Sequence, residues 1–171
     1  MEADPEAVAR AIALRQLTSG PRTRAQLAAA MKRRHVPEDV AETVLDRFED
    51  VSLVDDEEFA RQWVTTRHAG RGLARRALSY ELRQRGVADD VVKDAVGELT
   101  GEDELAAARE LVRRRAPAMR ADDPARRTRR LAGMLARRGY SGAVAMRAIR
   151  EELDTADDDA EGYPAGDLDE G

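Results

Sequence analysis

The chain has 171 residues, of which 37 % are charged, 42 % are hydrophobic and 4 % are aromatic, and it contains no cysteine. The lack of cysteine excludes disulfide bonds, thiol catalysis and cysteine zinc sites, and the two histidines, His35 and His68, lie in unlike contexts that offer no metal site. Ala, Leu, Arg and Glu are strong helix formers, so the composition favours an all-α protein. We expect no cofactor. We expect a cytoplasmic protein, because the sequence shows neither an apolar signal segment nor a stretch of about 18 apolar residues.

Charge is distributed unevenly along the chain. The formal net charge is −5, but residues 154–171 carry eight acids and no base, which leaves 29 bases against 26 acids in the rest. Arginine supplies 27 of the 29 bases and gathers at 67–85 and 109–130, with six and nine arginines. Codon bias in a GC-rich genome can explain the preference for arginine over lysine, but not the clustering. Because arginine binds phosphates and carboxylates in a flat, bidentate way, each cluster is a candidate anion-facing surface.

Helical patterns follow one another from the N-terminus, and no stretch shows the sustained two-residue alternation of a strand. Longer helices are expected over 5–18, 56–69 and 102–116, and each is followed by a pair of shorter ones. Thr23 and Gln26 have the spacing of a capping box, which opens the second helix. The sequence therefore predicts nine helices in three triplets.

One pattern of five apolar positions occurs three times, at offsets of 51 and 53 residues. Leu78 and Leu82 are four residues apart, so they share one face of a helix, and Val87 begins the next. Gly86 stands where a left-handed cap would end the first helix of the pair, whereas His35 occupies the equivalent position in the first copy. The fifteen repeated positions are Leu27, Met31, Val36, Val40, Leu45, Leu78, Leu82, Val87, Val91, Val96, Leu131, Leu135, Tyr140, Val144 and Ile149.

These copies predict an all-α fold of three tandem three-helix, helix-turn-helix-like repeats in an elongated, curved arrangement. The expected boundaries are 1–52, 53–100 and 101–153, followed by an acidic tail over 154–171. The tail is poor in apolar residues, so we expect it to be disordered.

Catalytic motifs are missing from the sequence. There is no phosphate-binding loop of the GxxxxGK[ST] kind, and no serine or threonine has a histidine and an acid nearby in a helical frame. The four acids at 55–58 are explained by the start of a helix, where the macrodipole favours negative charge. We therefore predict a binding protein rather than an enzyme.

The segment over 53–87, LVDDEEFARQWVTTRHAGRGLARRALSYELRQRGV, resembles the central signature of the RecX family, bacterial regulators of the RecA recombinase. The resemblance extends over about residues 5–153, and the acidic tail lies outside it. It implies tandem three-helix repeats, binding to the RecA–DNA filament along its groove, and inhibition of ATP hydrolysis, strand exchange and co-protease activity in homologous recombination, DNA repair and the SOS response. The matching positions are Leu53, Asp55, Phe59, Ala60, Trp63, Val64, Arg67, Leu78, Glu81, Leu82, Arg85, Gly86 and Val87.

The candidate site residues lie mainly in this signature. We expect Phe59, Trp63 and Val64 to point into the core, and Phe59 and Trp63 to fix the central repeat, while the arginines that follow point outward to acidic protein surface or DNA phosphates. The simpler interpretations are a core tryptophan without further function and a solvated helix face. The structural anchors are Phe59, Trp63, Leu78, Leu82, Gly86 and Val87, and the candidate contacts to RecA or DNA are Arg67, Arg71, Arg75, Arg76, Arg83, Arg113, Arg114, Arg126, Arg127 and Arg130.

The leading hypothesis is a filament regulator that is a monomer and acts without a membrane. Whether it also contacts single- or double-stranded DNA directly is left open by the sequence. The alternative is a transcription factor with tandem helix-turn-helix units, although the third helix of each repeat is acidic or mixed, which disfavours insertion into a DNA groove. A structural adaptor is a third possibility. Opposite charge alone suggests that the tail over 154–171 competes with DNA for the arginines of the third repeat.

Overall fold

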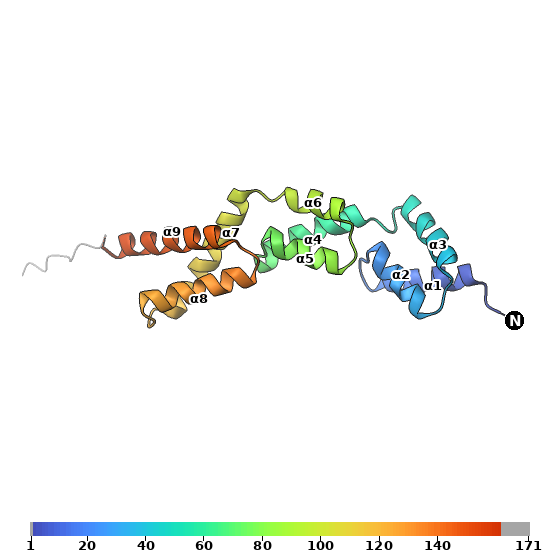
Figure 1. The fold of residues 1–171 in the computed structure, drawn as a ribbon, viewed down its shortest axis with the longest axis horizontal. Helices are drawn as coiled ribbons and strands as arrows, with labels where there is room; N and C mark the ends of the chain where they lie inside the picture. Colours follow the sequence, from blue (N-terminus) through green and yellow to red (C-terminus); the bar gives the residue numbers. More distant parts are fainter. Residues whose placement is uncertain (1, 162–171) are drawn as a thin grey trace, which may run out of the picture. The chain divides into compact units, whose positions relative to one another are not determined.

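The computed structural model describes residues 2–161, and in this range it contains nine α-helices, one short 3₁₀ helix and no β-strand (Figure 1). The predicted all-α class is thereby confirmed, and the expected long helices match α1, α4 and α7 to within two residues at each end. None of the helices in the described range has the length and apolar character that crossing a membrane requires. The helices are α1 (Pro5–Thr18), α2 (Arg24–Arg33), α3 (Glu38–Asp50), α4 (Asp56–Arg71), α5 (Arg75–Gln84), α6 (Asp89–Gly97), α7 (Gly101–Arg115), η1 (Ala116–Met119), α8 (Pro124–Arg137) and α9 (Gly142–Glu161).

Polar side chains fix where several helices begin. Thr23 and Gln26 form the predicted capping box of α2, in which each side chain bonds the backbone N–H of the other residue. Thr100 and Asp103 form a second box at the start of α7, which the sequence reading missed. Each such cap contributes about 1 kcal/mol to helix stability.

The turn after the first short helix is the same in all three repeats. His35, Gly86 and Gly139 have positive φ values of 60°, 77° and 91°. This is the left-handed cap predicted for the two glycines, whereas at His35 a strained or differently shaped turn was expected and the same cap is found. The next residue donates its N–H to the carbonyl oxygen five positions earlier at 3.1–3.2 Å, and these pairs are Val36 to Met31, Val87 to Leu82 and Tyr140 to Leu135. Because both members of each pair are apolar, the cap also places two side chains of the core together.

The side chains at the fifteen repeated apolar positions contribute to the core of the three repeats. Ten of them are buried and the other five are partly buried. In the first repeat the core is completed by Ala9 and Ala13 of α1 and by Val44 and Phe48 of α3. Aliphatic and small residues therefore make up nearly all of the interior, as the low aromatic content requires.

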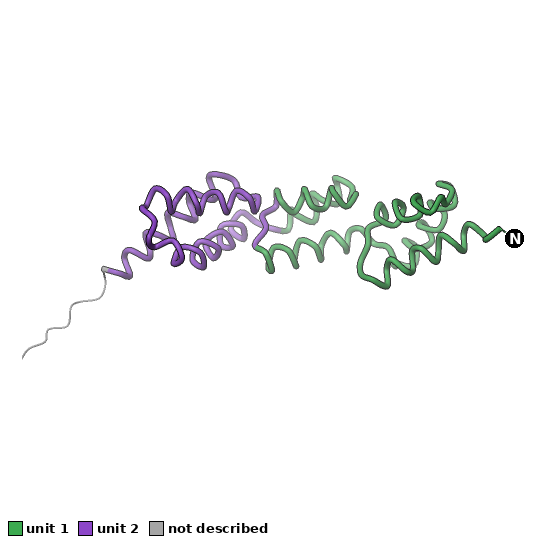
Figure 2. Tube along the Cα trace, turned by 90° about the horizontal axis from the view of Figure 1, so that it is seen from below, with its two compact units in different colours: residues 1–71, 76–98 green, residues 72–75, 99–171 purple. Residues whose placement is uncertain are grey.

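The chain divides into two compact units (Figure 2). Unit 1 consists of residues 1–71 and 76–98 and holds the first two repeats, whereas unit 2 consists of residues 72–75 and the chain from 99 onward and holds the third. Within unit 2, α9 packs against α7 and α8.

The short segment 72–75 is bound firmly to unit 2. Ala74 is completely buried in its core and donates its N–H to the Arg138 carbonyl oxygen at 2.9 Å. The Tyr140 hydroxyl donates a 2.6 Å hydrogen bond to the Gly72 carbonyl oxygen. The turn between α4 and α5 is thus part of the core of the third repeat.

Helix α9 continues to Glu161, beyond the boundary at 153 that was expected from composition. Residues 154–160 of this helix are exposed. The composition of a segment indicates how little apolar surface it can bury, which is why disorder was expected here. A helix that has already formed can nevertheless continue, because each added residue gains one backbone hydrogen bond. The remaining part of the predicted tail, 162–171, lies outside the described residues.

Candidate functional site

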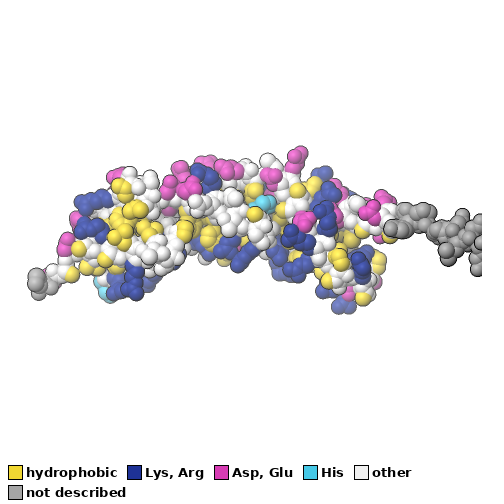
Figure 3. Space-filling model, turned by 180° about the vertical axis from the view of Figure 1, so that it is seen from behind, with side chains coloured by type: hydrophobic (Ala, Val, Ile, Leu, Met, Phe, Trp, Pro, Cys, Tyr) yellow, Lys and Arg dark blue, Asp and Glu magenta, His cyan; other side chains and the backbone are white. Residues whose placement is uncertain are grey.

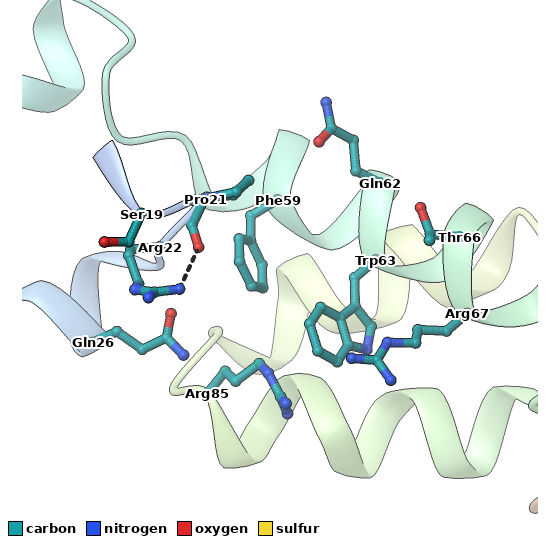
Figure 4. A pocket seen from close by; sticks show the side chains of 11 residues that line it. Ser19, Pro21, Arg22, Gln26, Phe59, Gln62, Trp63, Thr66, Arg67 and Arg85 are labelled. Atoms are coloured by element: carbon teal, nitrogen blue, oxygen red, sulfur yellow. Dashed lines mark hydrogen bonds between the residues drawn. The ribbon is translucent and has the colours of Figure 1, made fainter. Parts of the chain in front are cut away.

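The tryptophan side of α4 faces a surface cavity of about 520 Å³ in unit 1 (Figure 4). Phe59 and Trp63 line this cavity and are only partly buried, whereas Ala60 and Val64, one position further along, are buried. The prediction that Phe59, Trp63 and Val64 all point into the core is therefore confirmed for Val64 and wrong for the two aromatic residues. Phe59 and Trp63 do share one face of α4, as predicted. The buried stripe next to it is formed by the smaller residues Ala60 and Val64, which let neighbouring helices approach closely.

Trp63 is held by contacts on several sides. Its ring stacks on that of Phe59 with 5.7 Å between centroids and 17° between planes. The indole Nε1 donates to Glu81 Oε2 at 2.7 Å. The guanidinium carbons of Arg67 and Arg85 lie 4.2 and 3.9 Å from the ring centroid, so two cations are attracted to one aromatic system.

Arg85 is the residue of this cluster that was missing from the predicted contacts. It lies after the end of α5 and reaches Trp63 from the opposite wall of the cavity to Arg67 (Figure 4). Its Nη1 donates to the Glu81 carbonyl oxygen at 2.9 Å, and its own carbonyl oxygen accepts a 2.6 Å hydrogen bond from the buried Thr23 hydroxyl. Its place in the signature was visible in the sequence, but its approach to Trp63 depends on how α5 packs against α4.

The first repeat supplies the rest of the cavity wall, through residues 19–22 and Gln26. Arg22 is oriented there by hydrogen bonds from its Nε to the Gln16 side chain at 3.3 Å and from its Nη1 to the Pro21 carbonyl oxygen at 3.2 Å. The cavity therefore lies between two repeats of the same unit.

One further contact fixes the first repeat against the second, and ion pairs within the first repeat hold the same residue in place. The Arg24 backbone N–H donates to Asp56 Oδ1 at 2.9 Å, while burial raises the pKa of Asp56 above its ordinary value. The Arg24 guanidinium binds Asp46 and Glu49 at 2.8 and 2.9 Å. Because both walls are anchored within unit 1, the cavity is formed before any ligand arrives.

The lining of this cavity is cationic and aromatic. Its side chains include Arg22, Arg67 and Arg85, and no acid is among those that line it. Guanidinium groups next to aromatic faces bind carboxylates, phosphates and flat rings. No cluster of acids and histidines in the described part of the chain is arranged to hold a metal ion.

Most of the other predicted arginines are engaged within the chain. On the face drawn in Figure 3, some Lys and Arg side chains lie next to Asp and Glu side chains, and others gather in groups of their own. Arg71 also makes an interaction within the chain, Arg76 is exposed, and Arg127 lines a separate cavity in unit 2. The ion pairs are Arg83 with Asp89, Arg113 with Glu110 and Glu152, Arg114 with Glu110, and both Arg126 and Arg130 with Asp122.

Arg75 differs from the outward-facing role expected for it. Its guanidinium pairs with Glu104, a buried carboxylate of α7 in unit 2. A buried acid requires such a partner, so Arg75 has a structural task in unit 2.

Comparisons with known proteins agree with this organisation. Family models for the first, second and third three-helix domains of RecX match residues 9–48, 55–96 and 102–149. The Regulatory protein RecX of Thermobifida fusca is 60 % identical over 151 residues, which cover 88 % of this chain and 82 % of that protein. That of Streptomyces coelicolor is 52 % identical over 158 residues, which cover 92 % and 84 %.

A solved structure shows the same fold. The crystal structure of RecX from Lactobacillus salivarius has a TM-score of 0.81 and 20 % identity, over 89 % of this chain and 99 % of that one. The identity with the Thermobifida and Streptomyces proteins, together with the three consecutive domain matches, shows the family directly. The chain belongs to the RecX family.

Proposed function

We propose that this chain is a non-enzymatic regulator that binds the RecA–DNA filament in the cytoplasm and inhibits RecA recombinase, ATPase and co-protease activity. The relatives carry the name Regulatory protein RecX, and the signature over 53–87 supports the same role. The cavity around Trp63 offers guanidinium and aromatic groups, which bind ligands and do not transfer protons at neutral pH.

The observation that carries the proposal is the placement of Arg67 and Arg85 over Trp63. The ring holds both guanidiniums in place, so little side-chain entropy is lost when they bind a partner. A RecA–DNA filament presents both carboxylates and phosphates, and a guanidinium binds either with paired hydrogen bonds.

Contacts of this kind are suited to bridging neighbouring RecA subunits, and such bridging can inhibit the filament. A filament repeats the same subunit, so weak contacts from both units of this protein add up through effective concentration. If the bound form favours one state of the RecA subunits, it opposes their passage through the cycle of ATP hydrolysis.

The competing role as a transcription factor has less support in the described part of the chain. Helix α3 begins with Glu38 and Asp39, and α6 begins with Asp89 and Asp90, all of them exposed. These positions would enter the major groove in a helix-turn-helix protein, where negative charge repels the phosphates.

The test is a double variant of the Trp63 cluster, Arg67→Ala with Arg85→Ala, assayed for inhibition of DNA-stimulated ATP hydrolysis by RecA. We expect at least about a tenfold higher concentration for half-inhibition, because each lost charged hydrogen bond costs about 1.5–3 kcal/mol. The matched control is Arg15→Ala with Arg33→Ala, two exposed arginines of unit 1 away from the cavity. Co-sedimentation with RecA filaments separates lost binding from lost inhibition. Full inhibition by a folded double variant contradicts the proposal.

A further inference from the structure

A second cavity, of about 360 Å³, lies within unit 2 and combines positive charge with an apolar floor. It is bounded by α7, α8, α9 and the chain around η1. Val112, Ala116 and Leu153 contribute to its floor. Its charged lining consists of Arg109, Arg113, Arg120, Arg127, Glu152 and Asp159.

Two of the four arginines are neutralised within the protein. Glu152 is buried and accepts hydrogen bonds from Arg109 at 2.8 Å and from Arg113 at 2.9 and 3.2 Å. These contacts leave Arg120 and Arg127 as the basic groups of the cavity that have no ion-pair partner among the described residues.

Arg127 shows that this site has an unused donor. Its Nε is buried and has no hydrogen-bond partner in the described part of the chain. A buried donor without a partner costs about 1–3 kcal/mol, which an acceptor from a ligand would recover. The fitting ligand carries a carboxylate next to an aliphatic side chain, because the guanidiniums and the apolar floor line the same cavity. A DNA backbone supplies the negative charge but leaves the apolar floor without a partner.

The chain itself contains a segment with this chemistry at 166–170, Gly-Asp-Leu-Asp-Glu. Helix α9 lines the cavity at Asp159 and ends at Glu161, and Asp167 follows Glu161 by six positions. Six extended residues span roughly 20 Å, so a chain that turns back after Glu161 is long enough to return to the cavity. The residues between them include Gly162, Pro164 and Gly166, whose types favour a reversal of chain direction.

We propose that segment 166–170 binds in the cavity of unit 2, with Leu168 on the apolar floor and the adjacent carboxylates on Arg120 and Arg127. The bound segment covers these arginines and competes with any external acidic or phosphate ligand for them. This contact lies within the chain, so it forms or fails to form independently of RecA.

The absence of native cysteine allows a direct test in the full chain, because a single Gly171→Cys variant can be spin-labelled at one place. We expect the label to broaden the NMR amide signals of residues 116–120 and 153–156, and added salt to weaken this effect by screening. The double variant Arg120→Glu with Arg127→Glu should abolish the broadening, whereas its matched control Arg129→Glu with Arg150→Glu should retain it. The control residues are exposed on unit 2 and do not line the cavity.

Two results would overturn the proposal. One is the absence of broadening near the cavity at low salt. If an added single-stranded oligonucleotide then shifts the NMR signals of the cavity residues, the cavity binds nucleic acid and not segment 166–170. The other is broadening that persists in a folded Arg120→Glu, Arg127→Glu chain. Leu168→Ser should weaken the broadening without changing the charge, and an unchanged effect would exclude the apolar half of the contact.

Discussion

The indole Nε1 of Trp63 donates a 2.7 Å hydrogen bond to Glu81 Oε2, which joins α4 to α5 at the wall of the cavity in unit 1. The acceptor is a carboxylate, and charged acceptors make stronger bonds than neutral ones. Glu81 also uses its backbone carbonyl oxygen to bind Arg85. One residue of α5 therefore orients both the ring and one of its two cations.

We expect Trp63→Phe to keep an aromatic ring but to lower the free energy of unfolding by about 1–3 kcal/mol, because the partly buried carboxylate of Glu81 loses its donor. Chemical denaturation followed by far-ultraviolet circular dichroism measures this loss. Glu81→Gln keeps an acceptor for the indole and should cost less. Wild-type stability in Glu81→Gln would show that the charge of Glu81 has no part in holding the ring, whereas a loss as large as that of Trp63→Phe would show that the neutral amide cannot replace the carboxylate.

The second prediction concerns the close contact between the first two repeats. A Cβ atom added at Gly86 would lie 2.3 Å from the Cβ of Ala25, and the φ of 77° is unfavourable for any other residue. Gly86→Ala should therefore destabilise unit 1 by about 2 kcal/mol or more. In a thermodynamic cycle, Ala25→Gly should recover part of this loss by removing the clash. No recovery in the double variant would mean that backbone strain at Gly86 accounts for the whole effect.

The repeat could be predicted because its signals are local. The left-handed turn and the apolar pair that flanks it need particular residue types at fixed spacing, so Gly86 and Val87 revealed them without tertiary information. His35 adopts the same turn at a φ of 60°, which shows that the surrounding repeat determines the backbone there.

The site could be predicted only in part. Spacing placed Phe59 and Trp63 on one face, but periodicity does not tell which of two adjacent stripes faces the core when the true core residue is Ala60. The pairing of charges between different helices could not be predicted from the sequence either. Arg75 finds its acid in α7, and a sequence pattern cannot distinguish this buried partner from solvent.

Reversing the charge at Arg75 should destabilise unit 2 and should not act simply as the loss of a filament contact. Arg75→Glu places a second negative charge beside the buried Glu104, and we expect a loss of about 2 kcal/mol or more in the free energy of unfolding. Arg76→Glu is the matched control, since Arg76 is exposed, and should change stability by about 0.5 kcal/mol at most. Adding Glu104→Gln to Arg75→Glu should restore stability. Wild-type stability in Arg75→Glu would refute the structural role.

The last prediction follows from the Tyr140 hydroxyl, which donates to the Gly72 carbonyl oxygen inside unit 2. Burial, together with the nearby charge of Glu104, raises the pKa of Tyr140 from 10.0 to about 12. Because the folded state favours the protonated phenol, the hydroxyl contributes its full stabilisation below pH 10. The unfolded chain loses this proton first, so stability falls as the pH rises from 10 towards 12.

This fall should amount to about 2–3 kcal/mol at its greatest, since one pKa unit corresponds to about 1.4 kcal/mol. Urea denaturation at a series of pH values from 8 to 12 measures it. Tyr140→Phe should lower the free energy of unfolding by about 1 kcal/mol at pH 8 and should flatten the dependence above pH 10. Tyr80→Phe, at an exposed position, is the control and should leave the profile as it is. An equally steep fall in Tyr140→Phe would assign the pH dependence to other groups, and the segment 72–75 would then be held to unit 2 chiefly by the burial of Ala74.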